Sequence, residues 1–450
     1  MRNSGTTYTR SKWGPEKDGM TSCQSISPVA RKPFGQANAM AGMAAIAVSV
    51  FGAFFSVSAA SAQDGIDLEL KGKASAVIGI DDTGDGEGDV DAEITLKGSR
   101  ILDNGIELGA VVGARFDENQ PRQSFSAGRQ SGLLIGGPRG VGPLSGDAFV
   151  QGAYGYARGG FGKVIVGRDS GVARQLAVTA PTIFQSVNVN DFRTDLSGLN
   201  DIHTINDFSG YATKISYLPP ANLFGGVVGG LQLGVSYSPR LSECGEALCA
   251  PQDERELIPE TSLLNESSRW QNVLEGAFFY QKGLDFGSDG GDDLVVGFGA
   301  SVVTAEEDAN AVVNFFDDYQ AYSVGLNLAF RGLTLGGSVK TTNAGISIPD
   351  SDDDDYFAFD AGLTYKTGDW GFMLGYGQSE ANIIGPAPIL TDPQITRDTQ
   401  TAQAGITYFL GRGITVGAAA QYVESKKLEN APISGQEDSL TALTEIGIRF

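Results

Sequence analysis

Hydrophobic and polar residues alternate along most of the chain after residue 63, and the alternation has a period of two. The final segment is the clearest example, because Leu440, Ile446 and Ile448 share one face while Thr441 and Glu445 share the other. A period of two is typical of β-strands, since successive side chains of a strand point to opposite faces. The pattern predicts sixteen strands, at residues 66–80, 89–101, 106–117, 147–158, 162–170, 210–218, 230–239, 270–282, 294–304, 319–330, 333–342, 356–366, 370–379, 400–410, 413–424 and 439–450.

The connections between the predicted strands sort by length. Those after even-numbered strands are mostly tight turns that contain glycine, such as Gly159-Gly160, although 219–229 and 283–293 are longer. Most of those after odd-numbered strands are long and acidic. This arrangement is typical of an up-and-down meander whose two rims face different compartments.

The number of strands decides which face is the outer one. About sixteen strands are too many for side chains to fill the interior of a closed barrel, so the interior is expected to hold water. The apolar face of each strand must then point outward, toward lipid. We therefore expect an all-β protein, a transmembrane antiparallel β-barrel of about sixteen strands.

Aromatic residues near the strand ends fit the two interfacial girdles of such a barrel. Those near the short turns are Phe330, Tyr365, Trp370, Tyr408 and Phe450. Those near the long connections are Tyr322, Tyr356, Tyr376 and Tyr422. The ordinary preference of aromatic residues for strands is the alternative explanation.

The first 62 residues differ from the rest of the chain. Two basic residues precede an apolar, small-residue run over 39–57, which is followed by Ala60-Ser-Ala62. This order is typical of a cleaved secretory signal peptide, and a transmembrane anchor is the alternative. We therefore divide the chain into an N-terminal extension with a signal peptide, 1–62, and a barrel, 63–450.

The net charge of the barrel argues against one class of partner. Residues 1–62 contain six of the 32 basic and two of the 54 acidic residues, so residues 63–450 carry 26 basic and 52 acidic side chains, a net charge of −26. A protein that binds nucleic acid needs a basic surface. The chain is therefore not expected to bind nucleic acid.

Cysteine and histidine are scarce. Cys244 and Cys249 lie in one polar stretch and, in an exported protein, are expected to form a local disulfide, with free thiols as the alternative. His203 is the only histidine and lies elsewhere in the sequence, so a metal site at the cysteines is not expected. Because a hydrolase usually needs a histidine paired with a serine or a carboxylate, we do not expect an enzyme.

The connection over 171–209 is unusually long for a compact domain. Its middle part mixes apolar residues such as Val187, Leu196 and Ile202 with four aspartates. This composition predicts a segment that packs against another part of the protein.

Several stretches carry a resemblance to a known family. They are Gly162-Lys-Val-Ile-Val-Gly-Arg168, Ala212-Thr-Lys-Ile-Ser-Tyr217, Asn222-Leu-Phe-Gly225, Gly230-Leu-Gln-Leu-Gly-Val-Ser-Tyr237 and the terminal Ile448-Arg-Phe450. In these stretches the chain resembles the general diffusion porins of Gram-negative outer membranes, particularly those of alphaproteobacteria. The resemblance spans nearly all of residues 63–450 and implies a homotrimer in the outer membrane, with the third long loop folded into the lumen.

The resemblance also implies a constriction in which carboxylates of the inward loop face basic side chains of the barrel wall. The loop candidates are Asp191, Asp195, Asp201 and Asp207. The wall candidates are Arg168, Lys97, Arg115 and Lys214. The alternative is that the aspartates are solvated or cap turns. The facing of the strand that ends in Arg168 stays open, because a lumenal Arg168 places Val164 and Val166 inward as well.

One acidic connection has nearly the spacing of a calcium-binding loop, with Asp81, Asp85 and Asp89 as candidate ligands. The position that should carry a bidentate glutamate is Ala92, and strands flank the connection. A solvated strand connection is therefore favoured, and no other cofactor is expected. External acidic loops could also attract divalent cations that bridge lipopolysaccharide phosphates.

These observations predict a water-filled outer-membrane channel for the passive diffusion of small hydrophilic solutes and ions. The excess of acidic over basic residues predicts a mild preference for cations. A substrate-selective channel, for sugars for example, is the first alternative and needs an aromatic track through the lumen. A structural or adhesive barrel is the second.

Overall fold

A computed structural model of the chain describes residues 65–84, 86–117, 147–190, 195–197, 199–200, 202–221, 230–240, 270–284, 294–307, 318–342, 356–384, 394–428 and 436–450. They all belong to the second of the two units into which the chain divides, Ile46–Phe450. Among these residues, no helix has the length and apolar character needed to cross a bilayer.

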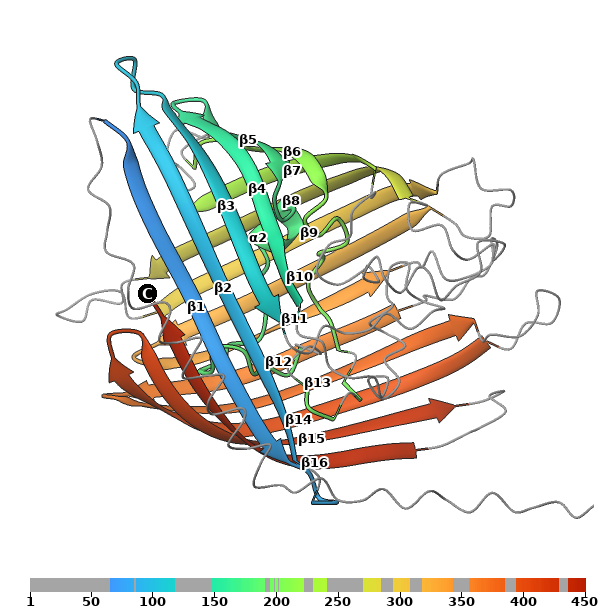
Figure 1. Cartoon of the computed structure of the whole chain (residues 1–450). Coiled ribbons are helices and arrows are strands. Elements are labelled where there is room, and N and C mark those ends of the chain that lie inside the picture. Colours follow the sequence, from blue (N-terminus) through green and yellow to red (C-terminus); the bar gives the residue numbers. More distant parts are fainter. Residues whose placement is uncertain are drawn as a thin grey trace, which may run out of the picture. The chain divides into compact units, whose positions relative to one another are not determined.

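The described residues form a closed barrel of sixteen antiparallel strands (Figure 1). The strands are β1 (Asp67–Ile80), β2 (Gly86–Ile101), β3 (Glu107–Asp117), β4 (Asp147–Gly159), β5 (Gly162–Arg168), β6 (Thr213–Leu218), β7 (Leu231–Arg240), β8 (Trp270–Leu284), β9 (Leu294–Glu307), β10 (Tyr319–Phe330), β11 (Leu333–Thr342), β12 (Tyr356–Thr367), β13 (Trp370–Ile384), β14 (Gln394–Gly411), β15 (Ile414–Leu428) and β16 (Gln436–Arg449). Each strand pairs with the next one along the chain, and β1 closes the barrel against β16 with Lys73 opposite Arg449 and Ile80 opposite Ala442. The predicted fold class and strand number are confirmed.

Several strands are longer than the alternation predicts. The ladder between β14 and β15 continues as far as the pair Thr396 and Leu428, beyond the predicted limits 400–410 and 413–424. The added residues are mostly polar, and their backbone groups pair although their side chains lack the apolar alternation. Hydrophobic pattern therefore marks the part of a strand that has an apolar face and misses the polar ends of the ladder.

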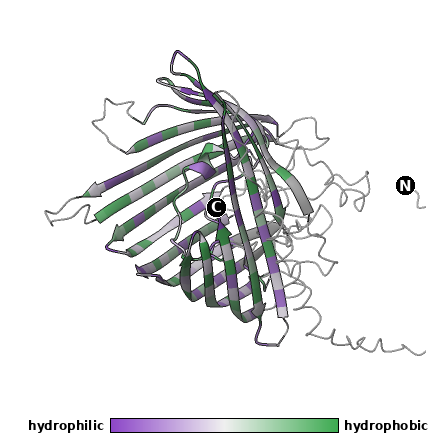
Figure 2. Ribbon diagram, turned by 60° about the vertical axis from the view of Figure 1, so that its left-hand side comes forward, coloured by the Kyte–Doolittle hydropathy of each residue, from purple (hydrophilic) through white to green (hydrophobic). Residues whose placement is uncertain are grey.

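The apolar rows lie on the outside of the barrel, as predicted. In β16, Leu440 and Ile446 are 51% and 45% exposed, whereas Thr441 and Glu445 are 3% and 1% exposed. The alternation of apolar and polar residues along the strands is visible in Figure 2. The prediction of an interfacial position is wrong for Tyr356. This side chain is fully buried, and its hydroxyl accepts a hydrogen bond from the backbone N–H of His203 at 2.8 Å.

Glycines on the inner wall leave room for the connection between β5 and β6, residues 169–212, which we call the inward segment. A Cβ atom added at Gly405 would lie 2.6 Å from the ring of Phe184, and one at Gly375 would lie 2.7 Å from Val189. Similar close approaches to the inward segment occur at Gly79, Gly234, Gly299, Gly325, Gly362, Gly371, Gly377, Gly417 and Gly447. The abundance of glycine thus has a packing reason, because wall positions without side chains let the inward segment approach this closely.

Apolar side chains of the inward segment pack on the same wall. Phe184, Val187 and Leu196 form a buried cluster with Val77, Met373, Ala419 and Leu443 of the barrel. This cluster lies inside the barrel, so part of the interior is a hydrophobic core and not an aqueous lumen.

We predict that Gly405→Val displaces the inward segment. The added side chain collides with Phe184, and overpacking of this kind costs about 1–3 kcal/mol. Amide hydrogen exchange at Phe184 and Val187 should accelerate by about tenfold, since about 1.4 kcal/mol corresponds to a factor of ten. The matched control is Gly160→Val, because a Cβ atom added at Gly160 has no neighbour within 4 Å. Equal exchange rates in the two variants would contradict the packing role of the glycine.

Candidate functional site

One buried lysine, Lys214 of β6, contacts both ends of the inward segment. The Nζ atom of Lys214 donates a hydrogen bond to the carbonyl oxygen of Asp169 at 2.6 Å and another to that of Gly210. These residues are the first and nearly the last of the segment, and the Lys214 side chain is only 2% exposed. Lys214, predicted as a constriction residue of the wall, therefore ties the two ends of the inward segment together.

A carboxylate of the last strand anchors the middle of the inward segment. The Glu445 oxygens accept hydrogen bonds from the backbone N–H groups of Gln185, Ser186 and Val187 at 2.7, 2.8 and 3.2 Å. The hydroxyl of Ser186 donates a fourth, at 2.8 Å. Hydrogen bonds to an ionised acceptor are stronger than neutral ones, so this is a firm attachment of backbone to wall.

A second wall carboxylate joins two distant parts of the inward segment. Asp360 on β12 accepts hydrogen bonds from the backbone N–H of Ala180 at 3.0 Å and from the hydroxyl of Thr204 at 2.6 Å. It also accepts one from the amide of Asn190 at 2.8 Å and two from Ser338 of β11. The outgoing and returning halves of the segment thus share one charged acceptor.

A third carboxylate contacts a short helix of the inward segment, α2 (Val172–Gln175). Glu275 on β8 accepts a hydrogen bond from the backbone N–H of Ala173 at 3.3 Å, and the hydroxyl of Ser236 on β7 accepts one from that of Val172 at 2.9 Å. The three anchors lie on β8, β12 and β16, so the segment is attached along half of the barrel wall.

A charge cluster joins the start and the returning half of the inward segment. The imidazole Nε2 of His203 lies 2.8 Å from Oδ1 of Asp207, and the guanidinium of Arg174 lies 3.9 Å from Oδ2. Burial alone would raise the pKa of Asp207. The interactions with His203 and Arg174 outweigh burial and hold the pKa of this carboxyl well below its usual range. Asp207 therefore stays ionised where ordinary carboxylates protonate, and its stabilising interactions are lost only as the pH falls through this lowered pKa.

Asp195 closes a turn within the inward segment. Its carboxylate accepts hydrogen bonds from the backbone N–H and the hydroxyl of Ser197, at 3.2 and 2.8 Å, and from the N–H of Asn200 at 2.8 Å. The residue is 1% exposed. This geometry matches the turn-capping alternative for the aspartates. Asp191 and Asp201 lie outside the described residues.

Two of the predicted wall cations have carboxylate partners on neighbouring strands. The guanidinium of Arg115 lies 2.9 and 3.1 Å from the two oxygens of Asp91. The ammonium of Lys97 lies 3.5 Å from Glu69 and 3.8 Å from Glu107. These cations point inward but are balanced by anions of the wall itself.

Arg168 occupies a different row. In the ladder it lies opposite Thr213, two residues beyond Val166, which is 56% exposed on the outer face opposite the exposed Ile215. By strand register Arg168 continues this outer row. Its side chain is half-buried. Its role as a wall cation of the constriction stays a prediction.

The structure adds nothing to the predicted calcium loop beyond local turns. Asp81 accepts hydrogen bonds from the N–H and hydroxyl of Thr83 at 3.0 and 2.7 Å, and Asp89 is 3% exposed on the inner row. Among the residues with described positions, no group of three metal-ligating side chains occurs. Asp85, Cys244 and Cys249 lie outside the described residues, so the calcium loop and the disulfide stay predictions.

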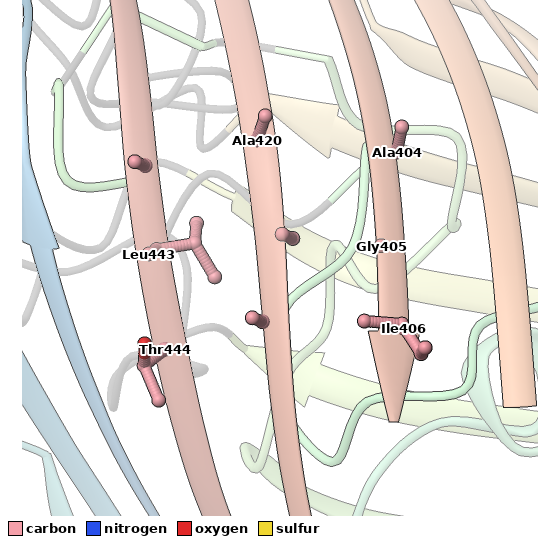
Figure 3. Close-up of a pocket in the computed structure, with 9 residues that line it drawn as sticks. Ala404, Gly405, Ile406, Ala420, Leu443 and Thr444 are labelled. Atoms are coloured by element: carbon pink, nitrogen blue, oxygen red, sulfur yellow. The ribbon is translucent and has the colours of Figure 1, made fainter. Parts of the chain in front are cut away.

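Residues of β14, β15 and β16 line a shallow depression (Figure 3). Most of its lining side chains, such as Ala404, Ala420 and Thr444, belong to the exposed rows of their strands. It therefore lies on the outer face of the barrel.

Sequence reasoning missed Glu275 and Asp360 and placed Glu445 on the polar face without a partner. The only available signal was an acidic residue within the small or polar row of a strand. Their partners in the inward segment lie 102 to 260 residues away along the chain, so no local pattern reveals them.

We predict that Glu445→Gln loosens the middle of the inward segment. The amide cannot offer two charged acceptor oxygens, and hydrogen bonds to charged groups contribute about 1.5–3 kcal/mol. Amide exchange at Gln185, Ser186 and Val187 should therefore rise by about tenfold or more. Glu424→Gln is the matched control, because Glu424 pairs with Lys426 at 2.7 Å on the outer row of β15. Unchanged exchange in Glu445→Gln would exclude it as an anchor.

Comparison with known proteins agrees with the geometry. The family model described as Gram-negative porin matches residues 44–428. A search of the curated proteins found no match.

Among solved structures, OmpF of Salmonella typhi, in complex with daunomycin, is 16% identical. The match covers 86% of this chain and 98% of the OmpF chain, with a TM-score of 0.51. OmpT, an outer membrane protein of Vibrio cholerae, is 12% identical over 87% and 100% of the two chains, with a TM-score of 0.50. The outer membrane channel DcaP of Acinetobacter baumannii is 13% identical over 88% and 100%, also with a TM-score of 0.50. At these identities the likeness is one of fold.

Proposed function

The chain belongs to the Gram-negative porin family, and on this premise we propose that it forms a water-filled outer-membrane channel through which small hydrophilic solutes and ions diffuse passively. The observation that carries the proposal is the attachment of the inward segment to the inner wall by Glu275, Asp360 and Glu445. A barrel of sixteen strands is wide enough for an aqueous lumen, and a segment fixed inside it narrows that lumen. Solutes are then selected by width and by lining charge.

The position of the inward segment supports a channel bounded by two different walls. Between Val172 and Phe208 the contacts of its described residues include β7 to β16 and β1. The other side of the channel is then the wall formed by β2 to β5. That wall carries Lys97 and Arg115 together with their carboxylate partners.

The charge distribution supports a mild preference for cations. Residues 63–450 have a net charge of −26, and the predicted wall cations Lys97, Arg115 and Lys214 are each bonded to oxygens of the chain itself. These three cations therefore contribute little to the attraction of anions, while the overall excess of acidic residues favours cations.

General diffusion is favoured over selective transport of sugars. A sugar track needs aromatic faces open to the lumen, whereas Tyr319 and Tyr356 are 1% and 0% exposed and Phe208 stacks on Tyr319 at 3.8 Å. Assembly as a homotrimer, export through residues 1–62 and contact with lipopolysaccharide are further parts of the proposal, supported by family membership.

We predict a potassium-to-chloride permeability ratio above one, measured from the reversal potential of single channels in planar bilayers across a salt gradient. The ratio should fall toward one at about 1 M salt, because the screening length shrinks to about 3 Å. Clear anion selectivity would contradict the proposed preference. Saturable flux of one sugar would favour the selective channel, and absence of conductance would favour a structural barrel.

We further predict different outcomes for two aspartates of the inward segment. Asp191→Asn should lower the permeability ratio, because it removes a carboxylate that we place at the constriction. Asp195→Asn should mainly accelerate amide exchange at Ser197 and Asn200, because its carboxylate closes their turn. An unchanged ratio in Asp191→Asn removes that residue from the constriction.

A further inference from the structure

Two like charges face each other on the inner wall at the short-turn end of β4 and β5. Arg158 and Lys163 are direct partners in the ladder between these strands, next to the turn that joins them. Both belong to the inner row, since Tyr156 and Ile165, two residues away on each strand, are buried in one inward-facing cluster with Val111. Like charges directly opposite each other in a sheet are destabilising, so this pair needs a compensating anion.

Two carboxylates attract the pair, and both are already engaged. Asp169 attracts Lys163 more strongly than Glu107 does, but its oxygens accept hydrogen bonds from the backbone N–H of Ser170 at 2.8 Å and from the amide of Gln175 at 3.2 Å. Glu107, the ladder partner of Arg158 on β3, accepts a hydrogen bond from the hydroxyl of Tyr156 at 2.5 Å and lies 3.8 Å from the ammonium of Lys97. Its charge is thus shared with Lys97 and its oxygen with a tyrosine. Glu107 and Asp169, both shared with other donors, therefore compensate the repulsion between Arg158 and Lys163 only in part.

Aromatic rings position the lysine without using its hydrogen-bond donors. The ammonium of Lys163 lies 4.9 Å from the ring centre of Tyr156 and 6.0 Å from that of Tyr154. A ring face attracts a cation but leaves its N–H groups available to oxygen acceptors. Within the described part of the chain, the side chain of neither Lys163 nor Arg158 has a hydrogen bond or an ion pair within 4 Å, and the carboxylates Asp169 and Glu107 attract them only from farther away.

This arrangement differs from that of the neighbouring wall cations. Lys73 lies 3.1 Å from Glu93, Lys97 contacts two glutamates, and Arg115 pairs with Asp91. Among the described residues of β1 to β5, Arg158 and Lys163 thus form a positively charged site, whereas the other inward-facing cations named here are each paired with a carboxylate.

We propose that Arg158 and Lys163 form an oxyanion subsite at the short-turn mouth of the channel, which takes the carboxylate or phosphate group of a small solute. Arginine offers a planar pair of N–H donors that matches two oxygens of such a group, and lysine adds a point charge. A bound oxyanion relieves the repulsion between the two side chains. The subsite extends the proposed function, because in a pore that favours cations it gives organic anions a place to bind during passage.

The test uses the full-length protein in planar bilayers, with succinate and inorganic phosphate as probes on both sides. Succinate should reduce the potassium chloride current in a saturable manner. Lys163→Gln and Arg158→Gln should each weaken this effect by about tenfold or more, because each removes a charged hydrogen-bond donor of the subsite. Lys163→Arg should retain it. Lys282→Gln, which removes a lysine from the outer row of β8 near the same rim, is the matched control and should behave as the wild type.

The outcomes separate the subsite from a simple field effect. If both glutamine variants shift the reversal potential but leave the succinate saturation unchanged, the pair acts only through its field and the subsite is excluded. Saturation by succinate but not by phosphate identifies the ligand group as a carboxylate, and equal saturation supports general oxyanion binding. Absence of any saturation in the wild type overturns the proposal.

Calorimetry of the detergent-solubilised protein with succinate keeps this test independent of the proposed channel function. Binding that is lost in the variant with both substitutions supports the subsite even if the protein conducts no current. Conductance without succinate binding contradicts the proposed subsite but not the proposed channel function.

Discussion

Hydrogen bonds from the backbone of the inward segment to carboxylates of the barrel wall are the interaction on which the rest of the structure depends. A buried backbone N–H must have a partner, and a long connection inside a barrel has no neighbouring strand to supply one. Glu275, Asp360 and Glu445 supply it from β8, β12 and β16. Their charge makes each bond stronger than a neutral one, so irregular backbone can lie against the wall without a ladder.

The glycines of the wall make these bonds geometrically possible. A side chain at Gly405 or Gly375 would occupy the space that Phe184 and Val189 fill. Removing side chains from one wall and adding apolar ones to the inward segment produces a core inside the barrel. The channel is therefore the part of the interior that this core leaves open, and its shape follows from where the segment is anchored.

Charge inside the barrel serves structure as well as selection. Asp195 closes a turn, Asp207 is held by His203 and Arg174, and Lys214 joins the ends of the inward segment. A charged residue in the inward segment or on the wall is thus no guide to selectivity until its partners are known. Only charged side chains that are not neutralised by a partner contribute a net electrostatic field to the lumen. Such side chains are expected where two like charges are neighbours.

The sequence by itself determined the class of barrel, the number of strands and the outer face, because a period of two and an apolar row are local properties of each strand. It also located the inward segment, since a long connection with buried-type residues is visible in the chain. Only the tertiary structure decided the anchors, because Gln185 meets Glu445 across 260 residues. It alone showed that Tyr356 faces inward and that Arg168 lies in register with an outer row. The physical reason is that alternation along a strand decides only whether a side chain points inward or outward. Whether a charged side chain is then neutralised depends on the residues placed beside it when the barrel closes and the inward segment folds.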